Sequence, residues 1–272
     1  MPRYTASIVA LGWAILAACT APTANEAVRT LQELAPTGKL RVGIAVGAVT
    51  SAFWTTKDSV SGRPQGVTVD LGADIASKLG VPIELVVYNN SGEVTAAGAR
   101  GEWDVAFMPV DAERAKIVDF GPTYFLIEST YLVPAGSSIS SIADVDRPGT
   151  RVLAIENTTT ARSAARSLKN TSVMTCKTVD ELYAAMRAGA ADAIALSRDA
   201  LDSFALKFPG ARVLPGYFQA TGIAIAVPKG HPTALAYVSA YIEQAKSSGQ
   251  VRRALDNAGL KGAPVAPAAM LN

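Results

Sequence analysis

Strands and helices are predicted to alternate in the first part of the chain, and this order constrains the fold more than any other feature. Leu40 to Ala45 is an apolar stretch typical of a buried strand. A helix follows, in which Leu71, Ile75 and Leu79 recur every four residues and share one face. The next predicted elements are a strand over Ile83 to Tyr88, a helix capped by Asn90 or Ser91 that runs to about Ala99, and a strand over Asp104 to Met108. This order predicts a parallel sheet in an α/β fold.

A second alternation of the same kind begins near residue 151. Asn157 to Thr160 offers caps for a helix over about Ala161 to Leu168. Val179, Leu182, Tyr183 and Met186 mark one face of the following helix. The predicted strands are Arg151 to Ile155, Ser172 to Met174 and Ala193 to Leu196. Two such lobes in tandem create a cleft between them, and clefts between domains are preferred ligand sites.

The last part of the chain is predicted to return to the first lobe. It contains a strand over Gly222 to Val227, a helix opened by Pro232, and a final helix near Val251 to Ala258. The chain then crosses between the lobes near Phe125 to Tyr131 and near Tyr217 to Gly222, and these crossings form two hinges. We expect lobe 1 to comprise residues 38–126 and 223–272, and lobe 2 to comprise residues 127–222.

Residues 1–19 have the pattern of an export signal. Arg3 supplies a positive charge, and Ile8 to Ala18 is an apolar stretch too short to span a bilayer. The sequence Leu-Ala-Ala-Cys that ends at Cys19 resembles the lipobox of bacterial lipoproteins, so Cys19 is the predicted lipidation site. The alternative is that Cys19 is an unmodified cysteine in a cleaved signal. Residues 20–37 are rich in Ala, Thr, Pro and Glu and are expected to form a tether, with some helix around Val28 to Leu34 as a further option.

Composition argues against several classes of function. The 272 residues include 25 Lys and Arg against 23 Asp and Glu, so the net charge of +2 gives no broad basic field for nucleic acid. His231 is the only histidine and lies in a turn sequence, and Cys176 is the only cysteine besides Cys19. A transition-metal site would therefore have to be mostly carboxylate. We expect no metal, no cofactor and no nucleic-acid partner.

Arg114 is the residue best suited to holding an anion. It follows a buried strand that Pro109 ends, and so it is expected at the carboxyl edge of the sheet, where small ligands bind in open α/β folds. A guanidinium group can bind a carboxylate through two parallel hydrogen bonds. The alternative is a surface ion pair of Arg114 with Glu113, Asp111 or Asp119.

Several short motifs occur in a fixed order between about Gly38 and Gly259. They are Gly-Lys-Leu-Arg-Val-Gly-Ile near the start, Glu113-Arg114 followed by Val-Asp-Phe-Gly-Pro-Thr-Tyr, Gly-Ala-Ala-Asp-Ala-Ile from Gly189, and Val-Pro-Lys-Gly-His-Pro from Val227. Together they resemble the periplasmic solute-binding proteins of the amino-acid-binding class, solute-binding family 3, which serve bacterial ABC importers. The resemblance implies a two-lobed α/β fold of class II, in which two mixed sheets with flanking helices are joined by two hinge strands. It also implies a monomer that closes around a small solute and delivers it to a permease in the inner membrane.

The resemblance further implies ligand-binding positions. Arg114 falls where these proteins hold the α-carboxylate of an amino acid, and Asn157 to Thr159 falls where backbone donors at a helix start approach the ligand. Phe53 or Trp54 falls where an aromatic side chain lines the pocket. The alternatives are that the threonines only cap their helix and that the aromatic residues belong to the core.

The sequence departs from the family pattern in both lobes. Ahead of the arginine, where amino-acid binders carry Ser or Thr donors, this chain has Pro109 and Asp111, and an ionised Asp111 would repel a carboxylate or hold a ligand cation. Where lobe 2 usually presents an aspartate to the α-ammonium group, this chain has Ser197, with Asp199 two residues on. The ligand therefore stays open among amino acids, modified amino acids and other small polar acids or amines. The expected ligand-binding residues are Phe53, Trp54, Pro109, Asp111, Arg114, Tyr124, Asn157, Thr158, Thr159 and Ser197.

Two other functions are compatible with the same fold. Some members of the fold resemble periplasmic enzymes such as cyclohexadienyl dehydratases, for which Glu128, Glu156 and Asp111 are the candidate acids or bases. The other is a sensor subunit that binds ligand and docks on a membrane partner without transport. We predict a binding protein without catalytic residues, located in the periplasm or cell envelope.

Overall fold

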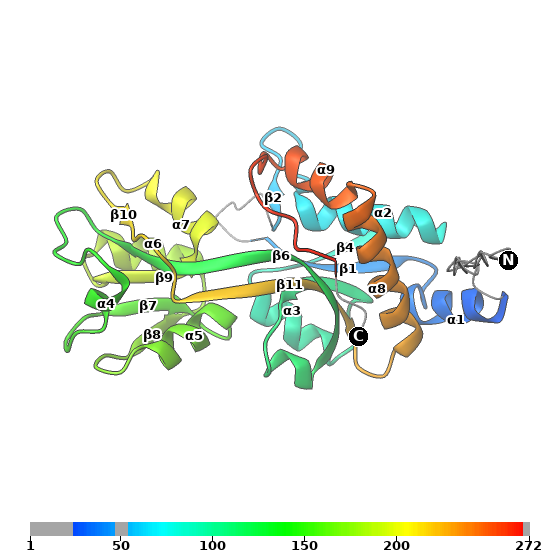
Figure 1. Cartoon of the computed structure of the whole chain (residues 1–272), viewed down its shortest axis with the longest axis horizontal. Coiled ribbons are helices and arrows are strands. Elements are labelled where there is room, and N and C mark those ends of the chain that lie inside the picture. Colours follow the sequence, from blue (N-terminus) through cyan, green and yellow to red (C-terminus); the bar gives the residue numbers. More distant parts are fainter. Residues whose placement is uncertain (1–23, 47–53, 269–272) are drawn as a thin grey trace, which may run out of the picture.

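The computed structural model describes residues 24–46 and 54–268 and consists of two lobes side by side (Figure 1). Lobe 1 contains elements from both ends of the described chain, and lobe 2 contains elements from its middle. Two long strands, β6 (Val118–Val133) and β11 (Gln219–Pro228), run through both lobes. The predictions for the export signal, for Cys19 and for Phe53 lie outside the described residues.

Lobe 1 is built on three parallel strands. β1 (Leu40–Ala45) lies between β4 (Ile83–Tyr88) and β5 (Val105–Pro109). The connecting helices are α2 (Val67–Leu79) and α3 (Ser91–Gly98), so the predicted order of strands and helices is confirmed. Every residue of β5 is buried, because α2 and α8 (Pro232–Ser247) cover one face of the strand and α3 covers the other.

Lobe 2 repeats this arrangement. β7 (Val152–Ile155) lies between β8 (Val173–Cys176) and β9 (Ala193–Ser197), and all three strands are parallel. α5 (Thr159–Ser167) and α6 (Val179–Arg187) connect them, as predicted. α7 (Arg198–Ala205) follows β9 directly and was not predicted from the sequence. α5 packs in one apolar cluster of the lobe, whereas α6 and α7 pack in another.

The predicted crossings between the lobes lie in β6 and β11. β11 pairs antiparallel with β5 and β6, and β6 pairs antiparallel with β9. The sheets of the two lobes are thereby linked into one path in the order β4-β1-β5-β11-β6-β9-β7-β8. The register of β6 and β11 shifts on either side of Ala224, and such irregularities bend a strand pair.

The region expected to be a tether contains a docked helix in its described part. α1 (Ala24–Leu34) packs on α8 (Pro232–Ser247), with Thr30 and Leu34 buried. The Glu33 carboxylate accepts a hydrogen bond of 2.7 Å from the backbone N–H of Ala234, in the first turn of α8. From residue 24 onward the segment is therefore part of lobe 1, because its few apolar and small side chains dock despite a linker-like composition.

The remaining elements are short or lie at the C-terminal end. α9 (Gln250–Asn257) follows α8 and packs against α2. Among the described helices, none is long and apolar enough to cross a membrane. The short elements are β2 (Thr56–Lys57), β3 (Pro64–Gln65), the 3-10 helix η1 (Arg114–Lys116), α4 (Ile142–Val145) and β10 (Arg212–Val213).

Candidate ligand-binding site

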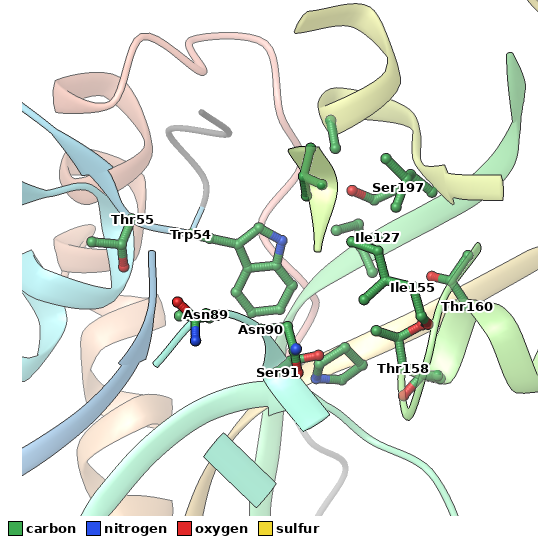
Figure 2. A pocket seen from close by; sticks show the side chains of 16 residues that line it. Trp54, Thr55, Asn89, Asn90, Ser91, Ile127, Ile155, Thr158, Thr160 and Ser197 are labelled. Carbon is green, nitrogen blue, oxygen red and sulfur yellow. The ribbon is translucent and has the colours of Figure 1, made fainter. Parts of the chain in front are cut away.

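A cavity of about 140 Å³ lies between the two lobes, and Figure 2 shows side chains from both lobes pointing into it. Ala45, Asn89 and Pro109 line it where β1, β4 and β5 end in lobe 1, and Ile155 and Ser197 line it where β7 and β9 end in lobe 2. The carboxyl ends of parallel strands in both lobes therefore face one space, which is where ligands bind in open α/β sheets.

Trp54 provides the aromatic wall of this first cavity. Its backbone carbonyl accepts a hydrogen bond of 2.8 Å from Thr68 Oγ1, and the Thr55 and Thr68 hydroxyls lie 2.7 Å apart. Both contacts tie the residue to the first turn of α2. The indole points across the cleft toward Ile127 (Figure 2). A flat apolar surface of this kind suits the hydrocarbon part of a small ligand.

The start of α5 forms the opposite wall. Thr158 caps the helix, since its hydroxyl accepts from the Ala161 N–H at 3.1 Å and donates to the Ile155 carbonyl at 2.8 Å. Thr158, Thr159 and Thr160 all line the first cavity. Thr158 therefore caps its helix and also lines the cavity. The same turn presents the N-terminus of α5 to the cleft, and a helix N-terminus favours an anion.

Replacing Thr158 by alanine should lower the free energy of unfolding by about 1 kcal/mol, because the α5 cap is lost. Urea denaturation monitored by circular dichroism would measure this change. The matched control is Thr158→Ser, which keeps the hydroxyl and should retain most of the stability. Equal stability of the alanine variant and the parent would show that the cap contributes nothing.

Arg114 follows β5 at the carboxyl edge of the sheet, and it is buried there, which contradicts the alternative of a surface ion pair. Its side chain is 2% exposed, and Nη2 donates to Ser91 Oγ at 2.8 Å. Nε and Nη1 are also buried and have no hydrogen-bond partner among the described residues. Burial lowers the pKa of Arg114 to about 10; the charge of Asp111 opposes this shift, and the charge of Arg162 adds to it. Because a pKa of about 10 is still well above neutral pH, the guanidinium group stays charged.

A second interlobe cavity of about 530 Å³ lies on the other side of Arg114. Arg114, Asn157 and Arg162 line it, and Asn90 lines both cavities. Asn157 has a positive φ of 59°, a left-handed conformation that asparagine adopts more readily than most residues. The two cavities therefore adjoin at Asn90, and Arg114 with its partner Ser91 lies between them.

Asp111 links the lobes and does not line either cavity. It follows β5 in lobe 1, and Oδ2 accepts a hydrogen bond of 2.8 Å from Thr159 Oγ1 in lobe 2. The same oxygen forms an ion pair with Arg162, while Oδ1 accepts from the Arg114 N–H at 2.9 Å. Burial raises the pKa of Asp111, but these three bonds outweigh it and hold the pKa below its usual value. The carboxylate is therefore ionised at neutral pH and bridges the lobes.

The predicted site residues divide into three groups. Trp54, Pro109, Thr158, Thr159 and Ser197 line the first cavity. Arg114 and Asn157 line the second. Tyr124 lines neither and is a correction: it is fully buried in the core of lobe 1, with its ring edge-to-face with Phe107 at 6.1 Å. It lies on the face of β6 that packs against the helices, so no ligand can reach it in this conformation.

The candidate acids of the enzyme alternative lie apart from one another. Glu128 pairs with Arg198 at 3.0 Å, outside both cavities, whereas Glu156 lines the second cavity. Together with Asp111, they form no common acid and base arrangement among the described residues. In the same part of the chain, no cluster of three or more His, Cys, Asp or Glu side chains is placed to hold a metal ion.

Several lining residues were not predicted. Asn89, Asn90 and Ser91 follow β4 at the same sheet edge as Arg114, and the Asn90 carboxamide caps α3 by accepting from Gly92 and Glu93 N–H at 2.9 Å each. The reasoning that identified Arg114 from the end of a strand would have identified them as well. Thr160 and Ile127 could not be found in this way, since nothing in the local sequence shows that they face the cleft.

Comparisons with known proteins agree with this geometry. The glutamine-binding protein of Geobacillus stearothermophilus is 27% identical over 201 residues, which cover 70% of this chain and 72% of that protein. The ABC transporter glutamine-binding protein of Bacillus subtilis is 26% identical over 249 residues, 87% of this chain and 89% of that protein. Among solved structures, the ancestral amino acid-binding protein AncCDT-1, a precursor of cyclohexadienyl dehydratase, is 27% identical with a TM-score of 0.72, covering 84% of this chain and 98% of its own.

The family assignment follows from a match that spans most of the chain. Residues 41–258 match the bacterial extracellular solute-binding proteins, family 3, and this range includes both lobes and the cleft between them. The fold class that the sequence motifs implied is confirmed. The chain belongs to the bacterial extracellular solute-binding proteins, family 3.

Proposed function

We propose that the protein is the substrate-binding component of an ABC importer, which captures a small polar solute between its lobes and delivers it to a permease. The observation that carries this proposal is the Arg114 guanidinium, buried between the two cavities with Nε and Nη1 unpartnered among the described residues. A buried cation with free donors is costly unless a ligand anion pairs with it.

In this proposal each wall of the cleft has a role. Arg114 binds a carboxylate of the solute, and the start of α5 faces the same negative charge with its helix N-terminus. Trp54 covers the apolar part of the solute, while Ser91 and Ser197 offer hydroxyl groups. β6 and β11 act as the hinges about which the lobes close.

A thermal-shift screen of residues 24–272 against amino acids, modified amino acids, small carboxylates and amines tests the proposal. A solute at a hundred times its dissociation constant should stabilise the protein by about 2.7 kcal/mol. For a protein of this size we expect the melting temperature to rise by several degrees, roughly 2–4 °C for each kcal/mol. Failure of every small polar solute to stabilise the protein would contradict the proposal.

The dehydratase alternative retains one supporting observation, which is the similarity to AncCDT-1. We infer a binding role because the relatives named above are binding proteins. In addition, Glu156 lines the second cavity, whereas Asp111 pairs with Arg162 and lines neither cavity. Mass spectrometry after incubation distinguishes the two functions. A solute recovered unchanged supports binding alone, and a solute that is consumed supports the enzyme.

We also propose that the protein works as an exported monomer anchored by a lipid on Cys19. The Leu-Ala-Ala-Cys sequence supports the anchor. Intact-mass analysis of membrane-purified protein would reveal the lipid, and Cys19→Ser should release the protein in soluble form. A sensor subunit would bind the same solute without transporting it. Uptake of labelled solute by cells that lack the protein separates the two functions, because uptake is lost only if the protein serves transport.

Replacing Trp54 by alanine should weaken solute binding by about tenfold, which is about 1.4 kcal/mol. The indole is part of the cavity wall, and its loss removes apolar contact with the solute. Isothermal titration calorimetry with the solute found in the screen would measure the change. Trp54→Phe is the matched control and should keep most of the affinity. Unchanged affinity in the alanine variant would exclude Trp54 from the site.

A further inference from the structure

The protein balances the charge of Asp111 with its own side chains across the cleft. Its partners in lobe 2 are Thr159 Oγ1 at 2.8 Å and the guanidinium of Arg162, both on α5. In lobe 1 the Arg114 N–H donates to it at 2.9 Å. The Asp111 side chain is 11% exposed, so little of it is open to a further partner. A ligand ammonium group could bind Asp111 only by displacing Arg162.

The guanidinium group of Arg114 has no direct partner of opposite charge among the described residues. Asp111 lies near enough to raise the pKa of Arg114 but bonds to its backbone N–H, whereas the guanidinium donates to the neutral hydroxyl of Ser91. Nε and Nη1 of Arg114 are buried without a partner, and the same is true of Nε of Arg162, among the described residues. The junction of the two cavities therefore holds two guanidinium groups and one carboxylate, a surplus of one positive charge.

The described lining of the first cavity offers no carboxylate to a cationic group. Of the described residues that line it, none carries an ionisable Asp, Glu, Lys, Arg or His side chain. Ser197, at the position where the family resemblance implied an aspartate, adds only a hydroxyl.

The second cavity carries side chains of both signs of charge. Its described lining has four basic side chains, Arg114, Lys116, Arg162 and Lys177, against three acidic ones, Glu93, Glu113 and Glu156. The carboxylate of Glu113 already pairs with Lys116 at 2.8 Å, and Glu93 accepts from the Asn89 N–H at 2.9 Å. Glu156 is the remaining acidic side chain of this lining, so a carboxylate for a ligand cation is absent from the described lining of the first cavity but present in that of the second.

We propose that the solute is a small carboxylate without an ammonium group, such as an α-hydroxy or α-oxo acid, and that Arg162 fills the place where a ligand cation would meet Asp111. This inference rests on the proposed function and names the substrate class of the same site. In this proposal the carboxylate meets Arg114, which lines the second cavity, and the rest of the solute occupies the first cavity, whose volume of about 140 Å³ is small beside the roughly 300–1,000 Å³ of pockets for drug-sized ligands.

Matched sets of acids that differ only at the α-carbon test this inference. The sets are alanine, lactate and pyruvate; phenylalanine, phenyllactate and phenylpyruvate; and glutamine with glutaramate. Isothermal titration calorimetry with the purified protein should show that an ammonium-free acid binds at least about tenfold more tightly than its matched amino acid. Glutamine and glutaramate are included because two relatives are glutamine-binding proteins.

Replacing Arg162 by glutamine should change this selectivity, because it frees Asp111 for a cation. We expect the affinity ratio of amino acid to ammonium-free acid to rise by at least about tenfold. Arg166→Gln is the control: it removes an equal charge from α5, one turn further on, where Arg166 contacts Ser163 at 2.7 Å. Should Arg162→Gln unfold, the double variant Asp111→Asn with Arg162→Gln removes both charges and should keep the selectivity of the parent.

The outcomes separate this inference from the proposed function. Tighter binding of an amino acid than of its matched ammonium-free acid overturns the inference and leaves a binding protein. An unchanged ratio in Arg162→Gln, or a reversal of selectivity in the double variant, overturns the role of the Asp111–Arg162 pair. If no acid of any set binds at millimolar concentration, the inference fails, whereas the proposed function fails only if the wider thermal-shift screen is also silent.

Discussion

Replacing Arg114 by methionine should weaken solute binding by at least about a hundredfold, or about 2.7 kcal/mol. The guanidinium is 2% exposed and has two donors, Nε and Nη1, without a partner among the described residues. Hydrogen bonds to a charged group contribute about 1.5–3 kcal/mol each, and more than one should be lost here. Isothermal titration calorimetry with the solute identified in the screen would measure the loss.

The same variant should not reduce the stability of the ligand-free protein. Methionine has a flexible apolar side chain, and it removes a buried charge that has too few partners. We therefore expect an unchanged or higher melting temperature. Arg100→Met, at an exposed arginine of lobe 1 paired with Glu102, is the matched control and should bind normally. Retained affinity in Arg114→Met would exclude Arg114 as the anion anchor, and lost folding would contradict our account of its burial.

The order of elements could be predicted because the patterns behind it are local. Leu71, Ile75 and Leu79 fall in α2, and Val179, Leu182, Tyr183 and Met186 are all buried on one face of α6. β6 was only partly recognised, because Gly121 and Pro122 interrupt its pattern and Pro122 cannot donate to a strand ladder. The docking of α1 on α8 was missed because it depends on tertiary contacts of Glu33 and Leu34.

The sequence indicated where the candidate site lies, but it did not indicate how the charged side chains of the site pair with one another. Arg114 was found because it follows a buried strand, and its burial results from α3 and η1, which the local sequence does not show. The pairing of Asp111 with Arg162 joins residues 51 positions apart, so no local pattern indicates it. Tyr124 was misjudged because the irregular start of β6 hid which of its side chains face the core.

Replacing Gly92 by leucine should prevent full closure of the lobes and weaken solute binding by about 10- to 100-fold. Gly92 lies in the first turn of α3, and a Cβ atom there would be 2.8 Å from Asn157 Cβ and 2.9 Å from Asn157 O in lobe 2. Such overpacking costs about 1–3 kcal/mol, and the two tightest contacts exist only while the lobes are closed, whereas the contact of 3.1 Å with Asn90 Oδ1 inside lobe 1 requires a shift of a few tenths of an ångström by that side chain. Leucine also favours a helix more than glycine does, so lobe 1 should not be destabilised.

Small-angle X-ray scattering and calorimetry together test this prediction. The parent protein should become more compact when solute is added, whereas Gly92→Leu should keep the larger radius of gyration and bind weakly. Ala99→Leu, at the exposed end of the same helix, is the matched control and should close and bind as the parent does. Normal compaction with full affinity in Gly92→Leu would contradict the closure proposed here, because the backbone of Asn157 could then not lie against α3 in the liganded state.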